Sequence, residues 1–280
     1  MTTLKEFLRN KLTKKELSQL RASYDIIGDI AILEIPRELV KKQKNIAHAM
    51  LQLHRNVHVV AKKKGGHRGR YRIQPLEILT GEKRLTTEHK ESGLRFRLDA
   101  GKCYFSPRLS TERMRIAALV QPNEKILVMF SGIAPYPLVL ARHTSAKKIV
   151  GVELNPIAHR FAEENVRINK LQQKIQLVKG DSKKIVPRLH QTFDRILMPL
   201  PSGAGTYLSQ ALTVAKNKAT IHFYAFAAED AFDAAAQKVL ALCARLKKRC
   251  QVIRIVRAGQ PAARKFRICI DVEVMGSRAR

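Results

Sequence analysis

Two acidic residues follow apolar segments of the chain, at positions where a carboxylate can bind a nucleotide-like ligand. The segment 147–152 is predicted to be a strand that leads into Glu153, and the segment 175–178 is predicted to be another, followed by Asp181. In doubly wound sheets a carboxylate at the end of the second strand binds a ribose diol. An aspartate after the third strand can accept a hydrogen bond from an adenine amino group. Asp181 has an alternative interpretation as the N-cap of a helix around Ile185.

A turn of small residues completes this pattern. It follows the predicted strand that ends at Phe130, and it contains Ser131, Gly132 and Ile133. Glycine allows the backbone to approach a ligand closely, although one glycine in such a turn is a weak signal. Together the turn and the two acids have the layout of a class I S-adenosylmethionine-dependent methyltransferase, and the set is much more specific than any one member.

The surrounding elements predict an α/β fold. Seven short strands with interleaved helices indicate a doubly wound, Rossmann-like sheet. The last two strands have no helical pattern between them, which indicates an antiparallel hairpin at one edge. The predicted strands are 125–130, 147–152, 175–178, 195–198, 220–224, 251–256 and 266–274. The predicted helices are 111–120, 137–142, 157–169, 206–214 and 231–248.

The first hundred residues have a different pattern, which predicts a smaller α+β domain. Residues 1–20 are expected to form one short basic helix with Leu4, Leu8 and Leu12 on a single face. The elements expected after it are two strands around Gly28, a helix at 37–54 and strands at 57–61 and 70–73. The expected parts are a basic helix at 1–23, an RNA-binding domain at 24–100 and a methyltransferase domain at 101–280.

The charge of the chain points to a polyanionic partner. Its 280 residues include 53 Lys and Arg against 23 Asp and Glu, a formal net charge of +30. Such an excess is typical of nucleic-acid-binding proteins, and a solvated basic surface is the alternative. Between Lys62 and Arg72 there are six basic residues and no acid. A flexible basic loop suits a phosphate backbone, and a solvated hairpin tip is its alternative.

Other features exclude several classes of protein. No apolar run is long enough for a transmembrane helix, and the N-terminus lacks the pattern of a secretory signal. The four cysteines show no metal-ligand spacing and are expected to be reduced thiols. We therefore expect a cytoplasmic protein without a metal or membrane partner, and a monomer.

Six segments, in their order and spacing, resemble one family. From about Tyr24 to Val274 the chain is similar to the archaeal–eukaryotic tRNA (guanine-37, N1)-methyltransferases and their wybutosine-pathway relatives. The segments are KCYFSPRLSTERMRIA, MFSGIAPYPLVLA, GVELNP, EENVRINK, KGD and DRILMPLP. The resemblance implies methyl transfer from S-adenosylmethionine to N1 of guanosine 37 in tRNA. The module that many archaeal members use for the outer corner of tRNA is expected to be missing, with the short basic helix in its place.

This reaction needs a base, because N1 of guanine carries a proton at neutral pH. Negative charge then develops on O6, which needs a cation or a hydrogen-bond donor. The resemblance implies that Glu112 is the base and that Arg72 supports O6. From the residues alone, Glu112 is rather a first-turn acid in a helix capped by Ser110 or Thr111, and Arg72 is as well explained by a phosphate contact.

The resemblance also implies binding residues. Those for the cofactor are Phe130, Ser131, Gly132, Ile133, Glu153, Leu154, Asp181, Ser182 and Pro199. Those for RNA, together with the basic loop, are Tyr104, Arg108, Arg113, Lys62, Lys63, Lys64, Arg68 and Arg70. Arg108 and Arg113 are expected to arrange the target nucleotide and nearby phosphates.

Three positions depart from the family pattern. Val128 replaces an acid before the turn, Ala134 replaces the second glycine of the turn, and Pro199 replaces an asparagine that contacts guanine. Proline offers a carbonyl but no donor, so recognition at this point would depend on the carbonyls of Met198 and Pro199. Two alternatives therefore stay open: transfer of the aminocarboxypropyl group of the same cofactor, and an RNA-binding protein with a decayed cofactor pocket.

Overall fold

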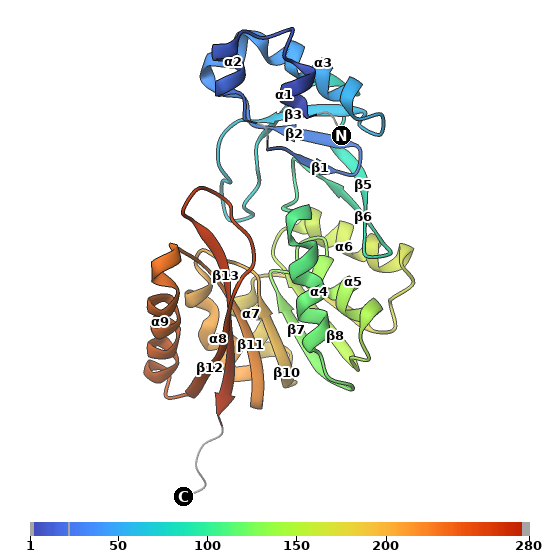
Figure 1. Ribbon diagram of the computed structural model, residues 1–280. Helices are drawn as coiled ribbons and strands as arrows, with labels where there is room; N and C mark the ends of the chain where they lie inside the picture. Colours follow the sequence, from blue (N-terminus) through green and yellow to red (C-terminus); the bar gives the residue numbers. More distant parts are fainter. Residues whose placement is uncertain (1–2, 22, 276–280) are drawn as a thin grey trace, which may run out of the picture. The chain divides into compact units, whose positions relative to one another are not determined.

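The computed structural model describes residues 3–21 and 23–275, and the chain divides into two compact units (Figure 1). The N-terminal unit is Met1–Pro107, and the C-terminal unit is Arg108–Arg280. In the described part of the chain, no helix has the length and apolar character needed to cross a membrane. The expected division into a basic helix at 1–23, an RNA-binding domain at 24–100 and a methyltransferase domain at 101–280 stays a prediction.

The N-terminal unit begins with two short helices, α1 (Leu4–Phe7) and α2 (Lys14–Gln19), so the prediction of one continuous helix was wrong. Thr3 and Thr13 each start a helix through a capping box with the glutamate three residues on. Two strong start signals ten residues apart divide the segment. The predicted apolar face is nevertheless buried, because all three of its leucines belong to the core of this unit.

A four-stranded sheet in the order β1-β2-β3-β4 supports these helices. The strands are β1 (Asp25–Ile27), β2 (Ile30–Leu33), β3 (Val59–Lys63) and β4 (Leu76–Gly81). The 3₁₀ helix at Arg37–Lys42 and α3 (Gln43–Leu53) fill the connection between β2 and β3. Ile46 and Met50 of α3 are fully buried against the first leucines of the chain, which closes a separate core.

The segment after β3 differs from its prediction. Residues 70–73 form no strand, because Arg72 has a left-handed φ of 52° and a single bridge joins Arg68 to Ile73. This tight loop leads instead to β4. The antiparallel pair β5 (Thr86–Glu91) and β6 (Leu94–Asp99) follows, and it was not predicted.

The C-terminal unit contains the predicted seven-stranded sheet, in the order β12-β13-β11-β10-β7-β8-β9. Its strands are β7 (Lys125–Met129), β8 (Lys148–Glu153), β9 (Ile175–Lys179), β10 (Phe193–Met198), β11 (Ala215–Ala227), β12 (Arg249–Arg257) and β13 (Phe266–Met275). The last two strands pair antiparallel, as predicted. The strand order reverses beside β7, so the carboxyl ends of β7, β8 and β10 form the ligand edge expected of a doubly wound sheet.

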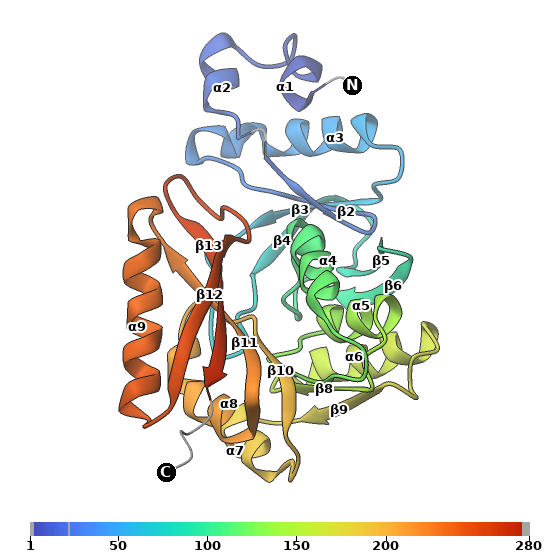
Figure 2. The ribbon, with the colours of Figure 1, turned by 60° about the horizontal axis from the view of Figure 1, so that its bottom comes forward.

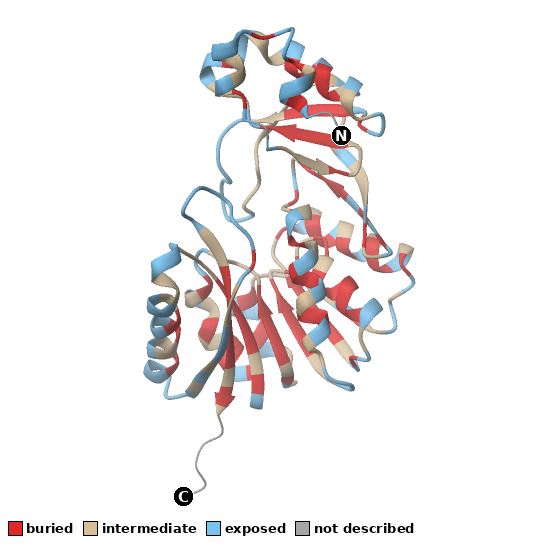
Figure 3. Ribbon diagram, viewed as in Figure 1, coloured by how far each residue is buried: buried red, intermediate tan, exposed pale blue. Residues whose placement is uncertain are grey.

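Helices cover both faces of this sheet (Figure 2). They are α4 (Ser110–Leu119), α5 (Pro135–His143), α6 (Pro156–Ile168), α7 (Ser182–Ile185), α8 (Leu208–Val214) and α9 (Phe232–Arg245). Buried residues concentrate in the central strands (Figure 3). One face, which includes Ile221 and Phe223 of β11, packs in an apolar core with residues of α8 and α9. Side chains two apart share a face, so His222 and Tyr224 belong to the opposite face.

Candidate active site

The turn after β7 has a strained backbone. Phe130, Gly132 and Ala134 have φ angles of 56°, 56° and 68°. The left-handed region costs a residue with a side chain about 1–2 kcal/mol, and such strain is frequent at ligand sites. The Ala134 N–H donates to the Ser131 carbonyl at 2.9 Å and closes the turn. The family's glycine position is therefore a left-handed position, which this chain fills with alanine.

Glu153 ends β8, and its carboxylate joins two backbone segments. One oxygen accepts a hydrogen bond from the Gly132 N–H at 2.7 Å, and the other accepts one from the Asn155 N–H at 2.7 Å. Burial raises the pKa of Glu153, although the backbone N–H groups oppose this shift. Among the residues that the structure describes, no cation pairs with this carboxylate. A carboxylate in this position can bind the two hydroxyls of a ribose.

Asp181 lies after the neighbouring strand and caps a helix. Its side chain accepts a hydrogen bond from the Lys183 N–H at 2.9 Å at the start of α7. The helix-cap interpretation is therefore confirmed, and the adenine contact stays a prediction. The Gly180 N–H donates to the Glu153 carbonyl at 2.8 Å, which ties the two strand ends together.

Further groups on this edge fit S-adenosylmethionine. The Ser131 hydroxyl is buried and has no hydrogen-bond partner among the described residues. The Phe130 ring meets the Tyr207 ring edge-on at 4.8 Å, and the Lys183 ammonium lies 5.0 Å from the centre of the Tyr207 ring. A ribose, an adenine ring and a polar amino-acid end need a carboxylate, aromatic surface and unsatisfied polar groups. The residues present therefore fit the predicted cofactor.

The fourth strand ends in a tight turn. The Leu200 N–H donates to the Met198 carbonyl at 2.7 Å, so this carbonyl has one lone pair engaged before any ligand arrives. Val128 is fully buried in β7, where the family has an acid. Ile133 and Ser182 are buried as well, while Leu154 is half-buried.

Glu112 lies in the first turn of α4 and is 6% exposed. Neither predicted capping residue caps this helix: its N-cap is Leu109, which makes no side-chain cap, so that part of the alternative was wrong. Arg115 binds the Glu112 carboxylate through two contacts, Nε to Oε2 at 2.7 Å and Nη2 to Oε1 at 2.8 Å. Tyr224 of β11 donates its hydroxyl to Oε1 at 2.5 Å. Three hydrogen bonds from Arg115 and Tyr224 therefore hold the Glu112 carboxylate.

The carboxylate of Glu112 is one end of a buried network that the sequence analysis missed. Arg115 Nη1 contacts Asp271 Oδ2 at 3.0 Å, and Asp271 Oδ1 lies 2.6 Å from His222 Nδ1. His222 Nε2 lies 2.8 Å from Arg195 Nη1, and Arg195 binds Glu124 through contacts of 2.7 Å and 2.8 Å. The network thus runs from α4 through β13, β11 and β10 to the residue before β7.

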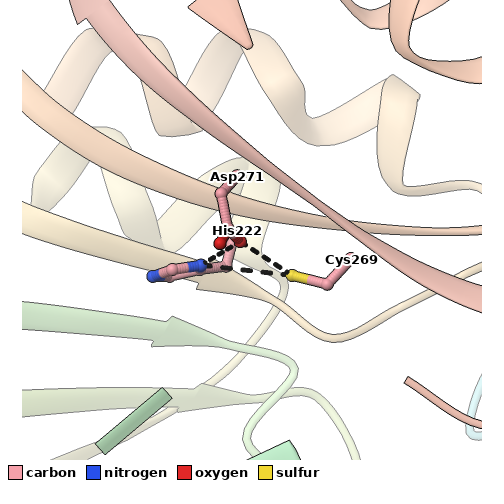
Figure 4. Close-up of side chains that lie close together, drawn as sticks. All are labelled: His222, Cys269 and Asp271. Carbon is pink, nitrogen blue, oxygen red and sulfur yellow. Dashed lines mark hydrogen bonds and ion pairs between the residues drawn. The ribbon is translucent and has the colours of Figure 1, made fainter. Parts of the chain in front are cut away.

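Part of this network has the residue types of a metal site. Figure 4 shows His222, Cys269 and Asp271 close together, with the Cys269 sulfur 3.2 Å from Asp271 Oδ1. Burial lowers the pKa of His222. Burial alone would raise the pKa of Asp271, but hydrogen bonds from His222 and Arg115 outweigh this and hold that pKa well below its usual range. Guanidinium groups of Arg115 and Arg195 contact the carboxylate and the imidazole. A cation would have to displace these positive charges, so we interpret the cluster as an ion-pair network.

The predicted lysines of the basic loop lie partly in a strand. Lys62 and Lys63 belong to β3. The Lys62 ammonium lies 2.6 Å from Gln43 Oε1 and 3.4 Å from a Glu77 carboxylate oxygen. Lys64 also approaches Glu77, at 3.7 Å. The loop itself therefore contains Arg68, Arg70 and Arg72, while the lysines before it have acidic or amide neighbours in their own unit.

The other predicted RNA-binding residues differ in exposure. Arg108 is exposed, whereas Arg113 of α4 is 1% exposed. Tyr104 packs its ring against His67 with 5.3 Å between the ring centres. Contact of these residues with RNA stays a prediction, and Arg108 is the more accessible of the two arginines.

The sequence and the structure both match characterised proteins. A model of the TRM5/TYW2 methyltransferase domain matches residues 87–253, and a model of the TYW2 N-terminal domain matches residues 4–84. The chain is 36% identical to the tRNA (guanine(37)-N(1))-methyltransferase Trm5b of Pyrococcus abyssi, over 91% of this chain and 76% of that protein. It is 30% identical to the tRNA(Phe) (4-demethylwyosine(37)-C(7)) aminocarboxypropyltransferase of Pyrococcus horikoshii, over 79% of this chain and 77% of that protein.

A solved structure of aTrm5 in complex with tRNALeu superposes with a TM-score of 0.84 at 30% identity, covering 97% of this chain and 78% of that chain. The match therefore includes both units as well as the seven-stranded sheet. The methyltransferase-domain model alone spans more than half of the sequence. The chain belongs to the TRM5/TYW2 methyltransferase family.

Proposed function

We propose that the chain is a tRNA methyltransferase that moves the methyl group of S-adenosylmethionine to N1 of guanosine 37. The observation that carries this proposal is the buried carboxylate of Glu112, at a position where the family motif has its general base. The similarity of the chain to the tRNA (guanine(37)-N(1))-methyltransferase Trm5b of Pyrococcus abyssi supports tRNA as the substrate and guanosine 37 as the target. The bound cofactor supplies an electrophilic methyl group on a sulfonium.

In the proposed reaction Glu112 accepts the N1 proton while the N1 electron pair forms the bond to the methyl carbon. Oε2 of Glu112 is the better acceptor, because its only contact among the described residues is Arg115 Nε, whereas Oε1 receives both Arg115 and Tyr224. Arg72 is proposed to stabilise the charge that develops on O6. Glu153 would hold the ribose of the cofactor, and the turn at 130–134 would supply backbone groups beside it.

A second candidate is transfer of the aminocarboxypropyl group to the same tRNA position. The match of residues 4–84 to a TYW2 N-terminal domain favours it, as does the relative from Pyrococcus horikoshii. It requires a different carbon of the cofactor to face the substrate. Ala134 and Val128, which depart from the methyltransferase pattern, lie in the β7 strand and turn where such a change would arise.

Mass spectrometry of nucleosides separates the candidates. Unmodified tRNA and tRNA with the wyosine precursor are each incubated with the protein and S-adenosylmethionine. We expect N1-methylguanosine from the first, and an aminocarboxypropyl product would instead support the second candidate. No product from either substrate would support the decayed, non-catalytic alternative. Digestion to oligonucleotides then tests whether position 37 carries the group.

The Glu112→Gln variant tests the base. Because general-base catalysis contributes about 10²–10⁴-fold, single-turnover methyl transfer should slow by that factor, with little change in cofactor or tRNA affinity. Raising the pH should partly restore the rate, because solvent then removes the N1 proton from more of the guanine. Arg72→Ala should cost about 10²–10³-fold and should gain less from high pH. A wild-type rate for Glu112→Gln near neutral pH would reject Glu112 as the base.

We further propose that tRNA is bound electrostatically, by a monomer in the cytoplasm. The net charge of +30 supports counterion release as the main source of affinity. Arg68 and Arg70 are the probes of the loop, because they lie in the loop itself, whereas Lys62 and Lys63 lie in β3. If each arginine binds one phosphate, replacing it by glutamine should reduce the salt slope by about 1. An unchanged slope would mean that this loop does not touch tRNA.

A further inference from the structure

The two oxygens of the Glu112 carboxylate have unequal surroundings. Oε1 accepts hydrogen bonds from Arg115 Nη2 and from the Tyr224 hydroxyl, and Oε2 accepts one from Arg115 Nε. A carboxylate oxygen has about two lone-pair positions. Oε1 is therefore saturated, and Oε2 retains one position for a proton. Burial raises the pKa of Tyr224 well above its ordinary value, so its hydroxyl remains a donor.

Arg115 is itself held from the opposite side. Its Nη1 contacts Asp271 Oδ2 at 3.0 Å, and Asp271 is anchored by His222, its cross-strand partner on β11. The guanidinium is planar and forms fixed bidentate pairs, so fixing one edge on Asp271 also fixes the edge that binds Glu112. Burial alone would lower the pKa of Arg115, but its hydrogen bonds to Glu112 and Asp271 outweigh this and raise that pKa. Arg115 therefore stays charged.

From these contacts we infer that Arg115, Tyr224 and Asp271 are positioning residues for the proposed base. Arg115 and Tyr224 set the rotation of the carboxylate so that Oε2 receives the N1 proton, and Asp271 keeps Arg115 in place. This inference rests on the proposed function, because it assigns a task to residues that act through Glu112. None of the three has to touch the tRNA or the cofactor.

The charges of the group suit one proton transfer. Before the reaction Glu112 and Asp271 are negative and Arg115 is positive, so the buried set carries one net negative charge. The N1 proton moves to Oε2, the N1 electron pair forms the new bond to carbon, and the carbon–sulfur pair leaves with the sulfur. The set is then neutral, and Arg115 keeps Asp271 as its partner. No buried charge is left unpaired, which would otherwise be costly. Loss of the proton to water restores the base.

A double-mutant cycle tests this inference. Tyr224→Phe removes one hydroxyl, and Asp271→Asn removes the charge that holds Arg115. Since a catalytic group misplaced by about 1 Å costs about 10²-fold, we expect single-turnover rates to fall about 10–100-fold in each variant. The dissociation constants for tRNA and cofactor should not change. In a Glu112→Gln background the same substitutions should change the rate less than about threefold, because coupled residues are not additive.

Asp194→Asn is the control. Asp194 pairs with Lys216 at 2.7 Å and accepts the Lys125 N–H at 2.8 Å in the same unit, and among the described residues its side chain has no hydrogen bond to a member of the network. It should lower the melting temperature and leave the single-turnover rate unchanged. Thermal melts identify any variant that fails to fold, and Tyr224→Phe keeps the test decisive if Asp271→Asn is lost.

The outcomes separate this inference from the proposed function. If Tyr224→Phe and Glu112→Gln slow the reaction additively, Tyr224 does not act through Glu112 and the inference is overturned while the base remains. The inference is equally overturned if Tyr224→Phe retains the wild-type rate, or if its only change is weaker tRNA binding. If Glu112→Gln itself retains the wild-type rate, the proposed base fails first.

Discussion

Glu153 ends β8 and Asp181 follows the neighbouring strand β9, but the fold accounts for only one of these two acids. Asp181 caps α7 by accepting the Lys183 N–H, which is a common structural task of aspartate. Glu153 is half-buried, accepts backbone N–H groups on both oxygens and has no cation beside it in the described part of the chain. Burying a carboxylate without a cation costs folding free energy.

The difference teaches which carboxylates at a strand end indicate function. A position at the ligand edge is shared by both acids, so the position alone does not distinguish a ligand-binding residue from a helix cap. Glu153 differs because burial raises the pKa of its carboxyl, and because no helix cap or ion pair among the described residues accounts for it. The left-handed Phe130 and Ala134 of the neighbouring turn are a second local cost. Both features lower the folding free energy gained at this place, so we interpret it as a ligand-binding site rather than as a structural feature.

The largest effect in this comparison should come from Glu153→Ala. Losing hydrogen bonds to a charged group costs about 1–3 kcal/mol, so the affinity for S-adenosylmethionine should fall about 5–150-fold by the same conversion. Isothermal titration calorimetry with the full chain measures this affinity. Affinity equal to that of the wild type would remove Glu153 from the cofactor site and would leave its burial unexplained.

Asp181→Asn should have a smaller effect. Asparagine caps a helix as well as aspartate does, so α7 should persist, and loss of one hydrogen bond to adenine should weaken cofactor binding by about 2–12-fold. Asp181→Ala removes the cap too and should lower the free energy of unfolding by about 0.5–2 kcal/mol. If Asp181→Asn weakens cofactor binding more than Glu153→Ala does, Glu153 is not the more important of the two acids for the cofactor.

The seven strands and their helices could be predicted because each is a short apolar run bounded by turn residues. Glu153 and Asp181 could be placed on one edge for the same reason, since the carboxyl ends of parallel strands coincide. The first twenty residues show the limit of periodicity: the apolar face was right, but the capping boxes at Thr3 and Thr13 decide where helices begin. The left-handed Arg72 likewise breaks a segment whose residue types favour a strand.

The surroundings of Glu112 could not be predicted, because its partners are distant in sequence. Tyr224 is 112 residues from Glu112, and Asp271 is 156 residues from Arg115. Only the three-residue spacing of Glu112 and Arg115 on one helix is a local pattern that favours an ion pair, and the sequence analysis did not single it out. Alternation within β11 and β13 places their polar residues on one face, but only the register pairs His222 with Asp271.

The smallest effect should appear in the pH dependence of folding. Burial raises the pKa of Glu153 above its ordinary 4.5, so the folded protein keeps this proton at a pH where the unfolded chain has lost it. The stability linked to this group is therefore complete below pH 4.5 and falls as the pH rises through the folded-state value. Urea unfolding of the cofactor-free protein should show wild type losing stability relative to Glu153→Ala as the pH rises from 4 to 7. Ser131→Ala, which removes a neighbouring group that does not titrate, should show no such trend. A constant difference between wild type and Glu153→Ala would mean that Glu153 ionises as easily in the folded protein as in the unfolded chain, and its surroundings would then no longer mark it as a ligand-binding residue.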